Sequence, residues 1–544
     1  MNNIRFTLKK TKHAMKPLLK QLLASTALLL AMGTMQAAEP VRIIPAVQEM
    51  TTADGALTLP GTPTIACPQE LENEGNLLIQ YLQADFGIRA TKEGDDATIS
   101  LRLDSGLSFP QEHGYTLDVS GKGVRIAAND ATGIFYGIQT LRQLVTKADE
   151  RCTLPYVAIN DYPAYRWRAF MHDDARSFKG KDIVLGLLDE MARLKLNVFH
   201  WHLTDDQGWR IQIDKYPRLT EVGAWRDSTQ LGGYRGITFD PHRHGGFYTK
   251  DDIRQVLDYA AARHILVIPE FEMPGHESAA IAAYPWLGTT GKEIKVPCTF
   301  GVQYEVMDIT SPRVYKFIED VLDEIIDLFP SPIIHIGGDE VKFDQWKASP
   351  RVQAYMKEHG ITTPADLQVL FTNDISYILS RKGRRMMGWN DITGNKIHEY
   401  NDADDATARQ KLAEGTIVQF WKGDLDLIEK TARQGYDIVN SYHYMTYLDY
   451  DYKQIPLRQA YDFSPIPEGL PKELEPRILG LGCQMWGEET LSDEWMYSRI
   501  FPRIAAYAEV GWTLPARKDY DSFLHSLEGL KNIWKKKGYQ VGGE

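Results

Sequence analysis

Along residues 161–544, an apolar run that ends in polar or charged residues is followed by an amphipathic helix, and this unit repeats eight times. Short apolar runs bounded by polar residues predict buried strands, whereas apolar positions that recur every three to four residues predict helices packed on one face. The eight predicted strands are Arg166–Met171, Asn197–Leu203, Ile265–Phe271, Ile333–Ile336, Arg384–Gly388, Thr416–Phe420, Asp437–Ser441 and Ile478–Cys483.

Eight strand–helix repeats predict an α/β fold, the (β/α)8 TIM barrel, in which helices surround a closed cylinder of parallel strands. The alternative is a doubly wound open sheet, which would usually carry a glycine-rich phosphate loop after its first strand, and the sequence shows none there. Two helix starts are marked. Thr249 and Asp252 form a capping box, and Thr310 is expected to cap a helix that Pro330 ends.

Residues 39–160 are predicted to form a small α/β sandwich domain before the barrel, which takes residues 161–544. Strand-like and helical stretches are mixed in this region on a scale typical of such domains. No catalytic constellation occurs there, so its expected role is structural support. The predicted elements are the strands Thr98–Leu103, Tyr115–Val119 and Gly123–Ala127 and the helices Glu70–Phe86 and Thr132–Val145.

Residues 1–38 have the layout of a secretory signal peptide. A positive region without acidic residues precedes an apolar stretch from Leu22 to Met32, and small residues end the segment at Ala37-Ala38. The alternative is an N-terminal membrane anchor, but the apolar stretch is too short to cross about 30 Å of hydrocarbon. We therefore expect an exported protein, periplasmic or secreted, with no membrane attachment once the signal is removed.

Composition narrows the function classes. The 544 residues carry a net charge of -12, and the 25% charged and 43% hydrophobic residues are ordinary globular values. Nothing resembles the basic footprint that a phosphate backbone requires, so no nucleic-acid partner is expected. Four cysteines could pair in three ways in an exported chain, and the sequence does not choose among them. They are Cys67, Cys152, Cys298 and Cys483.

Acids and aromatic residues follow nearly every predicted strand. In a barrel the active site lies where strands end and loops begin, so these positions share one pocket. Carboxylates that bind hydroxyl groups and indoles that stack on sugar rings are typical of carbohydrate sites. The positions are Arg176, Asp205-Asp206, Glu270, Glu272, His276, Asp339-Glu340, Trp389, Asp391, Trp421, Tyr447, Asp449, Trp486 and Glu488.

The most specific motif is His335-Ile336-Gly337-Gly338-Asp339-Glu340. The two glycines allow a close approach of backbone and ligand, and two adjacent acids follow them. Two carboxyls crowded in a partly dry pocket cannot both ionise easily, so the pKa of one rises and that group can act as a general acid. Exposed loop acids are the competing interpretation, and the glycines and the strand end argue against it.

A second motif is Phe199-His200-Trp201-His202, where alternation puts both histidines on one face of a strand. Two imidazoles near acids could hold a transition metal, as in metal-dependent amidohydrolases. No histidine ends the fifth, sixth or eighth run, however, so packed or hydrogen-bonded histidines are the favoured interpretation. No metal or other cofactor is expected.

Together these motifs resemble those of the family 20 glycoside hydrolases, the exo-acting β-N-acetylhexosaminidases. Gly-Gly-Asp-Glu at 337–340, His-Trp-His-Leu-Thr-Asp-Asp-Gln at 200–207, Pro-Gly-His at 274–276 and Trp-Gly-Glu at 486–488 occur in the family's order. The resemblance covers nearly the whole chain after the leader. It implies removal of terminal β-linked N-acetylhexosamine from a glycan or oligosaccharide, with retention of configuration. The 2-acetamido group of the substrate then acts as the nucleophile.

The resemblance also implies a role for each site residue. Glu340 would protonate the leaving oxygen and then act as base on water, and Asp339 would orient the acetamido N–H. Tyr447 would donate a hydrogen bond to the acetamido carbonyl. The indoles of Trp389, Trp421 and Trp486 would enclose the sugar. Its outer hydroxyls would be bound by Arg176, Asp449 and Glu488, and the acid would be supported by Asp205 and His276.

Two alternatives stay open at this point: a retaining glycosidase with a protein carboxylate as nucleophile, and a sugar-binding protein without turnover. The presence of Glu340 argues against the second. The preference for gluco or galacto sugars, the glycan source and the oligomeric state stay open as well.

Overall fold

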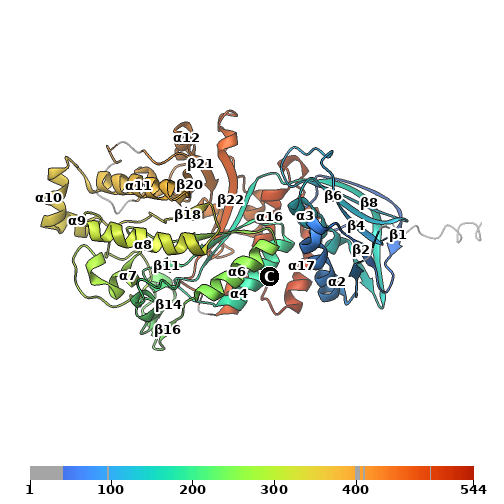
Figure 1. The fold of residues 1–544 in the computed structure, drawn as a ribbon, viewed down its shortest axis with the longest axis horizontal. Coiled ribbons are helices and arrows are strands. Elements are labelled where there is room, and N and C mark those ends of the chain that lie inside the picture. Colours follow the sequence, from blue (N-terminus) through green and yellow to red (C-terminus); the bar gives the residue numbers. More distant parts are fainter. Residues whose placement is uncertain are drawn as a thin grey trace, which may run out of the picture. The chain divides into compact units, whose positions relative to one another are not determined.

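The computed structural model describes residues 41–543 except 93, 95–96, 399–404, 409–410 and 491, and the predicted leader lies outside these residues. Arg42–Glu544 form one compact unit. Figure 1 shows its two parts: a sheet with helices, coloured blue to teal, and a barrel, coloured from teal through green and yellow to red. Within the described part of the chain, no helix has both the length and the apolar character needed to span a bilayer.

The small domain has an eight-stranded sheet, in which β5 is central and antiparallel to both β6 and β8. Helix α3 (Ala131–Leu144) packs on β5 and β6, and α2 (Glu72–Phe86) packs on α3. The three strands and two helices predicted here are all present. The strands are β1 (Glu49–Thr58), β2 (Thr64–Ala66), β3 (Thr91–Lys92), β4 (Ile99–Leu103), β5 (Tyr115–Ser120), β6 (Gly123–Ala128), β7 (Thr146–Ala148) and β8 (Arg151–Asp161).

The predicted (β/α)8 barrel is confirmed. Eight parallel strands close on themselves in the order of the chain, since β9 pairs with both β10 and β22. Each strand lies within two residues of its predicted bounds. The strands are β9 (Trp167–Asp173), β10 (Val198–His202), β17 (Leu266–Glu270), β18 (Ile333–His335), β19 (Arg385–Trp389), β20 (Ile417–Phe420), β21 (Asp437–Asn440) and β22 (Ile478–Met485).

Helices follow the strands, and short hairpins extend the loops after β10. The larger helices are α4 (Lys181–Arg193), α6 (Lys250–Ala262), α8 (Pro312–Leu328), α11 (Pro364–Arg381), α16 (Arg503–Trp512) and α17 (Tyr520–Lys536). Shorter ones are α5 (Arg218–Glu221), α7 (Ser278–Ala283), α9 (Asp344–Ala348), α10 (Pro350–Glu358), α12 (Asp426–Arg433), α13 (His443–Thr446), α14 (Leu457–Asp462) and α15 (Asp493–Ile500). The hairpin strands are β11 (Thr204–Asp205) with β12 (Gly208–Trp209), β13 (Trp225–Arg226) with β16 (His244–Gly245), and β14 (Thr229–Leu231) with β15 (Thr238–Asp240).

One predicted cap is confirmed and the other is wrong. The Thr249 side chain accepts from the Asp252 N–H, and the Asp252 carboxylate accepts from the Thr249 N–H, which completes the capping box of α6. Helix α8 begins one residue later than predicted, with Ser311 rather than Thr310 at its N-cap. Thr310 lies one residue before the N-cap, and its hydroxyl donates to the Asp308 carboxylate at 2.7 Å.

The barrel interior changes character from its base to its top. Side chains two residues apart on a strand point the same way, so each strand contributes a column to the interior. The lower layer is apolar, with residues from all eight strands in one cluster: Trp167, Ala169, Val198, Ile268, Ile333, Met387, Ile417, Val439 and Leu479. Two residues further along, the columns become polar, as at His200, Glu270, His335 and Gln419. Buried polar groups need partners, so this upper layer must be built as a hydrogen-bonded network.

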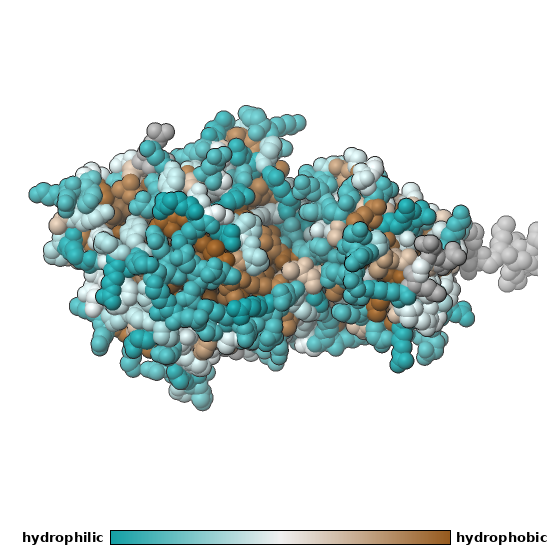
Figure 2. All heavy atoms as spheres, in the orientation of Figure 1, coloured by the Kyte–Doolittle hydropathy of each residue, from teal (hydrophilic) through white to brown (hydrophobic). Residues whose placement is uncertain are grey.

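Figure 2 shows a face on which hydrophilic side chains dominate and hydrophobic ones are confined to patches. The four cysteines are all free thiols, two of them buried (Cys152 and Cys483), so none of the three possible full pairings is formed.

Candidate active site

The acid pair lies on a tight turn after β18. Gly337 and Gly338 have φ of 61° and 90°, which favour glycine, and a Cβ on Gly337 would come within 1.6 Å of a Glu272 carboxylate oxygen. Glu340 itself has a φ of 51°, a strained conformation for a residue with a side chain. The Asp391 carboxylate accepts from the Glu340 N–H at 3.2 Å and helps to hold this turn.

The two acids have opposite environments. Burial, together with the nearby Asp391 and Glu340 charges, raises the pKa of Asp339 to about 7, and Asp339 Oδ1 is buried without a hydrogen-bond partner. Burial also acts on Glu340, but the imidazoles of His276 and His398 outweigh it and lower the pKa of that carboxyl. One pKa of the pair rises, as predicted, but it is that of Asp339 and not that of Glu340, the residue that the family resemblance makes the acid.

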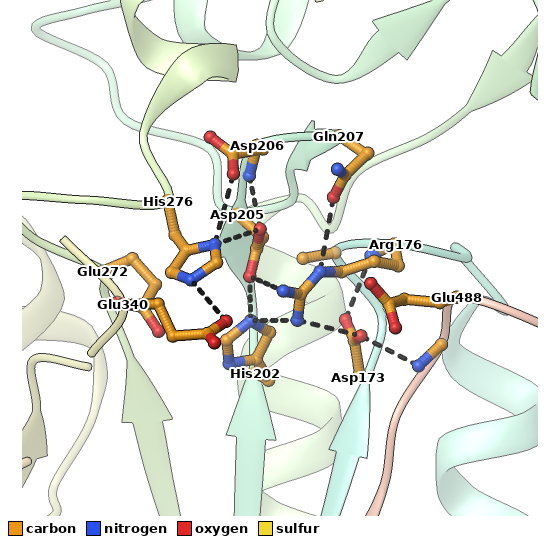
Figure 3. A network of polar contacts seen from close by, with 12 residues as sticks. Asp173, Arg176, His202, Asp205, Asp206, Gln207, Glu272, His276, Glu340 and Glu488 are labelled. Carbon is orange, nitrogen blue, oxygen red and sulfur yellow. Dashed lines mark hydrogen bonds and ion pairs between the residues drawn. The ribbon is translucent and has the colours of Figure 1, made fainter. Parts of the chain in front are cut away.

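Figure 3 shows His276 between Glu340 and a pair of carboxylates, Asp205 and Asp206. Its Nδ1 lies 3.2 Å from Asp205 Oδ1 and 3.2 Å from Asp206 Oδ2. Its Nε2 faces Glu340 Oε2 at 3.6 Å and Asp339 Oδ2 at 3.9 Å. Burial alone would lower the pKa of His276, but the surrounding carboxylates raise it well above its usual value, so the residue is a cation.

Arg176 is fixed on the other side of Asp205. Its guanidinium lies 2.8 Å from Asp205 Oδ2 and 3.3 Å from Asp173 Oδ2, and it donates to Gln207 Oε1 at 3.3 Å. The Arg176 Cζ atom lies 5.0 Å from the centroid of the Trp486 ring. The guanidinium is thus held in one orientation at the edge of the pocket (Figure 3), with an indole beside it.

Three indoles and a phenol form one aromatic cluster at the strand ends. Trp389, Trp421 and Tyr447 are buried together, and Trp486 packs against them. The Trp421 and Tyr447 rings are nearly parallel, 6° apart, with centroids separated by 6.3 Å, and the Trp389 and Trp486 centroids are 5.7 Å apart. Hydrogen bonds orient two of the indoles, from Trp389 Nε1 to Glu270 and from Trp421 Nε1 to Asp391, each 2.8 Å long.

Two further carboxyls lie at the same rim. Burial raises the pKa of Asp449 to about 8, and its Oδ1 has no hydrogen-bond partner. Burial also raises the pKa of Glu488, although the Arg176 charge opposes this, and Glu488 Oε1 accepts from the Gly301 N–H at 3.2 Å. Carboxyl oxygens that can accept further hydrogen bonds, near a guanidinium in a fixed orientation, are suited to binding sugar hydroxyl groups.

Glu270 connects four strands beneath the pocket. Its carboxylate lies 2.8 Å from His200 Nε2 and 2.9 Å from His335 Nδ1, and it also accepts from Trp389 and contacts His202 Nδ1. Despite burial, these groups hold the pKa of Glu270 well below its usual range. His202 also reaches Asp205 Oδ2 at 2.8 Å, and Glu270 raises its pKa to about 10. His202 is hydrogen-bonded, and His200 packs against the rings of His335 and Trp389, in agreement with the favoured interpretation of packed or hydrogen-bonded histidines.

Four groups among the described residues have ligand atoms close enough to hold a metal ion, with all atoms of a group within 4.8 Å of one another. One is His276, Asp339 and Glu340 at the acid pair. The others are His200, Glu270 and His335; His202, Asp205 and Glu272; and Asp205, Asp206 and His276. Most of these atoms already pair with each other, which accounts for their proximity without an ion.

Residues 165–515 match the sequence profile of the glycosyl hydrolase family 20 catalytic domain, and residues 40–162 match domain 2 of the same family. The chain belongs to glycosyl hydrolase family 20. This is a family of glycosidases, and the resemblance identified from the sequence motifs is confirmed.

Curated relatives and a solved structure agree with this placement. A beta-hexosaminidase of Porphyromonas gingivalis is 35% identical over 514 residues, which cover 90% of this chain and 62% of that protein. One of Vibrio furnissii is 35% identical over 478 residues, 85% of this chain and 73% of that protein. The crystal structure of an exo beta-N-acetylglucosaminidase from Vibrio harveyi in complex with N-acetylglucosamine is 29% identical, with a TM-score of 0.80 over 93% of this chain and 79% of that one.

Every site residue singled out in the sequence lies at the carboxyl ends of the barrel strands. Sequence reasoning assigned no role to Glu270, Glu272 and Asp391, although it noted them at strand ends. It missed His398, which lies outside any predicted strand or helix and whose Nε2 is 2.6 Å from Asp391 Oδ1. No local signal in the sequence marks this residue.

Proposed function

We propose that the protein removes terminal, non-reducing, β-linked N-acetylhexosamine from glycans, with the 2-acetamido group of the substrate as nucleophile and with retention of configuration. The supporting observation is the acid pair on one turn, where one carboxyl oxygen of Asp339 lies within 4.8 Å of one carboxyl oxygen of Glu340, together with the aromatic cluster at the strand ends. An inverting enzyme needs its carboxyls roughly 6.5–9.5 Å apart on opposite faces of the sugar.

In this mechanism Glu340 protonates the glycosidic oxygen while the acetamido carbonyl oxygen attacks the anomeric carbon. The C–O bond to the leaving group breaks, and an oxazolinium forms. Asp339 accepts a hydrogen bond from the acetamido N–H and balances the developing positive charge, and Tyr447 donates to the acetamido carbonyl. Glu340, now ionised, takes a proton from the water that opens the oxazolinium. The product then has the configuration of the substrate.

The remaining site residues hold the sugar and the acid. Trp389, Trp421 and Trp486 enclose the acetamido methyl and the sugar face. Arg176, Asp449 and Glu488 bind the outer hydroxyls, since they offer a fixed donor and two acceptors at the rim. Asp205 and His276 support Glu340 from behind.

Positioning and proton transfer contribute differently to the rate. An intramolecular nucleophile held in line gains an effective molarity on the order of 10⁵–10⁸ M. A positioned general acid contributes about 10²–10⁴-fold. Groups that hold the acetamido should therefore matter at least as much as the acid, which is consistent with the share of this pocket given to aromatic side chains.

We further propose that residues 39–160 support the barrel, that residues 1–38 direct export to the periplasm or beyond the cell, and that the reaction needs no cofactor. The chain spans 62% of the length of the Porphyromonas gingivalis relative, so the substrate is proposed for this chain on the basis of its own pocket.

The test uses aryl glycosides that differ only at the sugar's C2 substituent. Replacing acetamido by mono-, di- and trifluoroacetamido withdraws electrons from the carbonyl oxygen, so kcat/KM should fall steeply along the series if that oxygen attacks. A 2-hydroxyl analogue should be cleaved at least about 10³-fold more slowly, because it lacks the intramolecular nucleophile.

The Glu340→Gln variant tests whether Glu340 donates the proton to the leaving group. Glu340→Gln should retain most activity on a good leaving group such as dinitrophenol and lose it on an alkyl glycoside, since only the latter needs protonation. Comparable turnover of the 2-hydroxyl analogue, or a rate independent of fluorination, would favour a protein carboxylate as nucleophile. Binding of N-acetylglucosamine without any turnover would identify a sugar-binding protein instead.

A further inference from the structure

Asp391 joins three parts of the pocket through one carboxylate. Its Oδ1 accepts from the Glu340 N–H at 3.2 Å and lies 2.6 Å from His398 Nε2. Its Oδ2 accepts from Trp421 Nε1 at 2.8 Å. It lies in a 3-10 turn, Asn390–Thr393, directly after β19. The same group therefore fixes the strained backbone of the acid, one wall of the aromatic cluster and one imidazole.

That imidazole faces the acid from the side opposite His276. His398 Nδ1 lies 4.0 Å from Glu340 Oε1, whereas His276 Nε2 lies 3.6 Å from Glu340 Oε2. Each carboxyl oxygen thus has its own imidazole, and each imidazole is backed by a carboxylate, Asp391 or Asp205. Lys422 Nζ is 3.3 Å from His398 Nδ1, and its positive charge opposes the rise in the pKa of His398 that Asp391 causes.

The other titratable groups near Glu340 come from its own turn and from α13. Asp339 is its neighbour in the chain, and Lys342 lies on the same turn. His443, in α13, is held neutral at working pH, because burial and Lys422 lower its pKa to about 4. The Asp391 charge raises the pKa of His398, so this imidazole carries a proton over a range in which His443 does not.

We propose that Asp391 and His398 are positioning residues for the acid, which clamp the Glu340 carboxyl between two imidazoles and stabilise its ionised form. This inference rests on the proposed role of Glu340 as general acid and adds a second support, independent of Asp205 and His276. The ionised form is the one that must take the proton from water in the second step. Because it favours the ionised form, the clamp makes Glu340 a stronger proton donor in the first step and holds its carboxylate in place for the second.

The test is the pH profile of kcat/KM for His398→Gln with a poor leaving group. An opposite charge within about 4–6 Å lowers a carboxyl pKa by roughly one unit or more. Removal of the imidazolium should therefore move the alkaline limb up by about one pH unit, because Glu340 stays protonated to higher pH. The rate at the optimum should fall about tenfold or more, and KM for the sugar should change little.

His443→Gln is the matched control, since it removes a nearby imidazole that carries no charge. Its alkaline limb should stay where the wild type has it. Asp391→Asn keeps an acceptor for the Glu340 N–H but weakens the hold on His398, and it should also cost about tenfold. If the two residues act as one unit, the double variant should lose about tenfold rather than about a hundredfold.

An alkaline limb of His398→Gln that coincides with that of His443→Gln would overturn the inference, as would a hundredfold loss in the double variant. The position of the alkaline limb and the loss of activity are both measured relative to the wild type. A wild type that fails to cleave any N-acetylhexosaminide would instead refute the proposed function, so the two failures are distinct.

Discussion

At the scale of single residues, the two neighbouring carboxyls after β18 differ because their surroundings differ. Asp339 has a buried oxygen without a partner, and its pKa rises to about 7. Glu340 lies between two imidazoles, and its pKa is lowered. The two groups are in contact, so they titrate as a pair whose apparent pKa values belong to both. The reactive form has one proton on the pair, and the proposed mechanism requires that this proton moves to Glu340 before it is donated to the leaving oxygen.

A pH dependence follows from this single proton. As the pH rises through about 7, the pair loses its last proton, and kcat/KM should decline because no acid is left. In Asp339→Asn the neighbouring negative charge is gone, so the pKa of Glu340 falls further and the alkaline limb should move to lower pH. The measurement is kcat/KM for an alkyl N-acetylhexosaminide between pH 4 and 9, for wild type and variant. A wild type with full activity at pH 9, or a limb that does not move in the variant, contradicts this account.

At the scale of elements, the eight strands could be predicted because apolar periodicity is a local property of the chain. The strand-end residues could be predicted as well, since a barrel gathers all carboxyl ends at one face. Contacts between side chains of different strands and loops could not be predicted in this way. His398 is 58 positions from Glu340, and only the closed barrel and the turn after β19 bring them together. The cap of α8 was misplaced by one residue, since Ser311 occupies the N-cap and the Thr310 hydroxyl donates to Asp308.

Glu270 is the clearest case of a link between elements, since its carboxylate receives side chains from β10, β18 and β19. A glutamine at this position has one acceptor oxygen and no charge. Glu270→Gln should therefore destabilise the protein by about 3–5 kcal/mol, the usual cost of breaking a buried ion pair from one side. It should also lower activity, because the Trp389 indole loses its fixed orientation.

Urea unfolding followed by tryptophan fluorescence measures this loss. Glu429→Gln is the control, because Glu429 forms a largely exposed i,i+4 pair with Arg433 on α12, which contributes at most about 1 kcal/mol. Equal urea midpoints for Glu270→Gln and Glu429→Gln would mean that the contacts of the histidines with Glu270 do not stabilise the protein.

At the scale of the whole molecule, a buried polar group at the end of β8 joins the small domain to the barrel. Asp161 accepts from the Tyr115 hydroxyl at 2.6 Å and from the Gln48 N–H at 2.9 Å, both in the small domain. It also accepts from Lys195 Nζ at 3.0 Å and Trp512 Nε1 at 3.0 Å, both in the barrel. Lys195 is fully buried, and burial lowers its pKa despite the attraction of Asp161. One buried carboxylate at the junction therefore receives four donors, two from each domain.

Removal of that carboxylate should weaken the union of the two domains. In Asp161→Asn the Lys195 ammonium stays buried without a counter-charge, and the free energy of unfolding should fall by about 3–5 kcal/mol. Adding Lys195→Met removes the stranded charge and should recover a large part of the loss, because an apolar side chain of similar length fills the same space. Urea unfolding at pH 7 measures all three proteins. If the double variant is as unstable as Asp161→Asn, the cost comes from the Tyr115 and Trp512 hydrogen bonds instead of the buried charge, and the junction is then held by neutral donors.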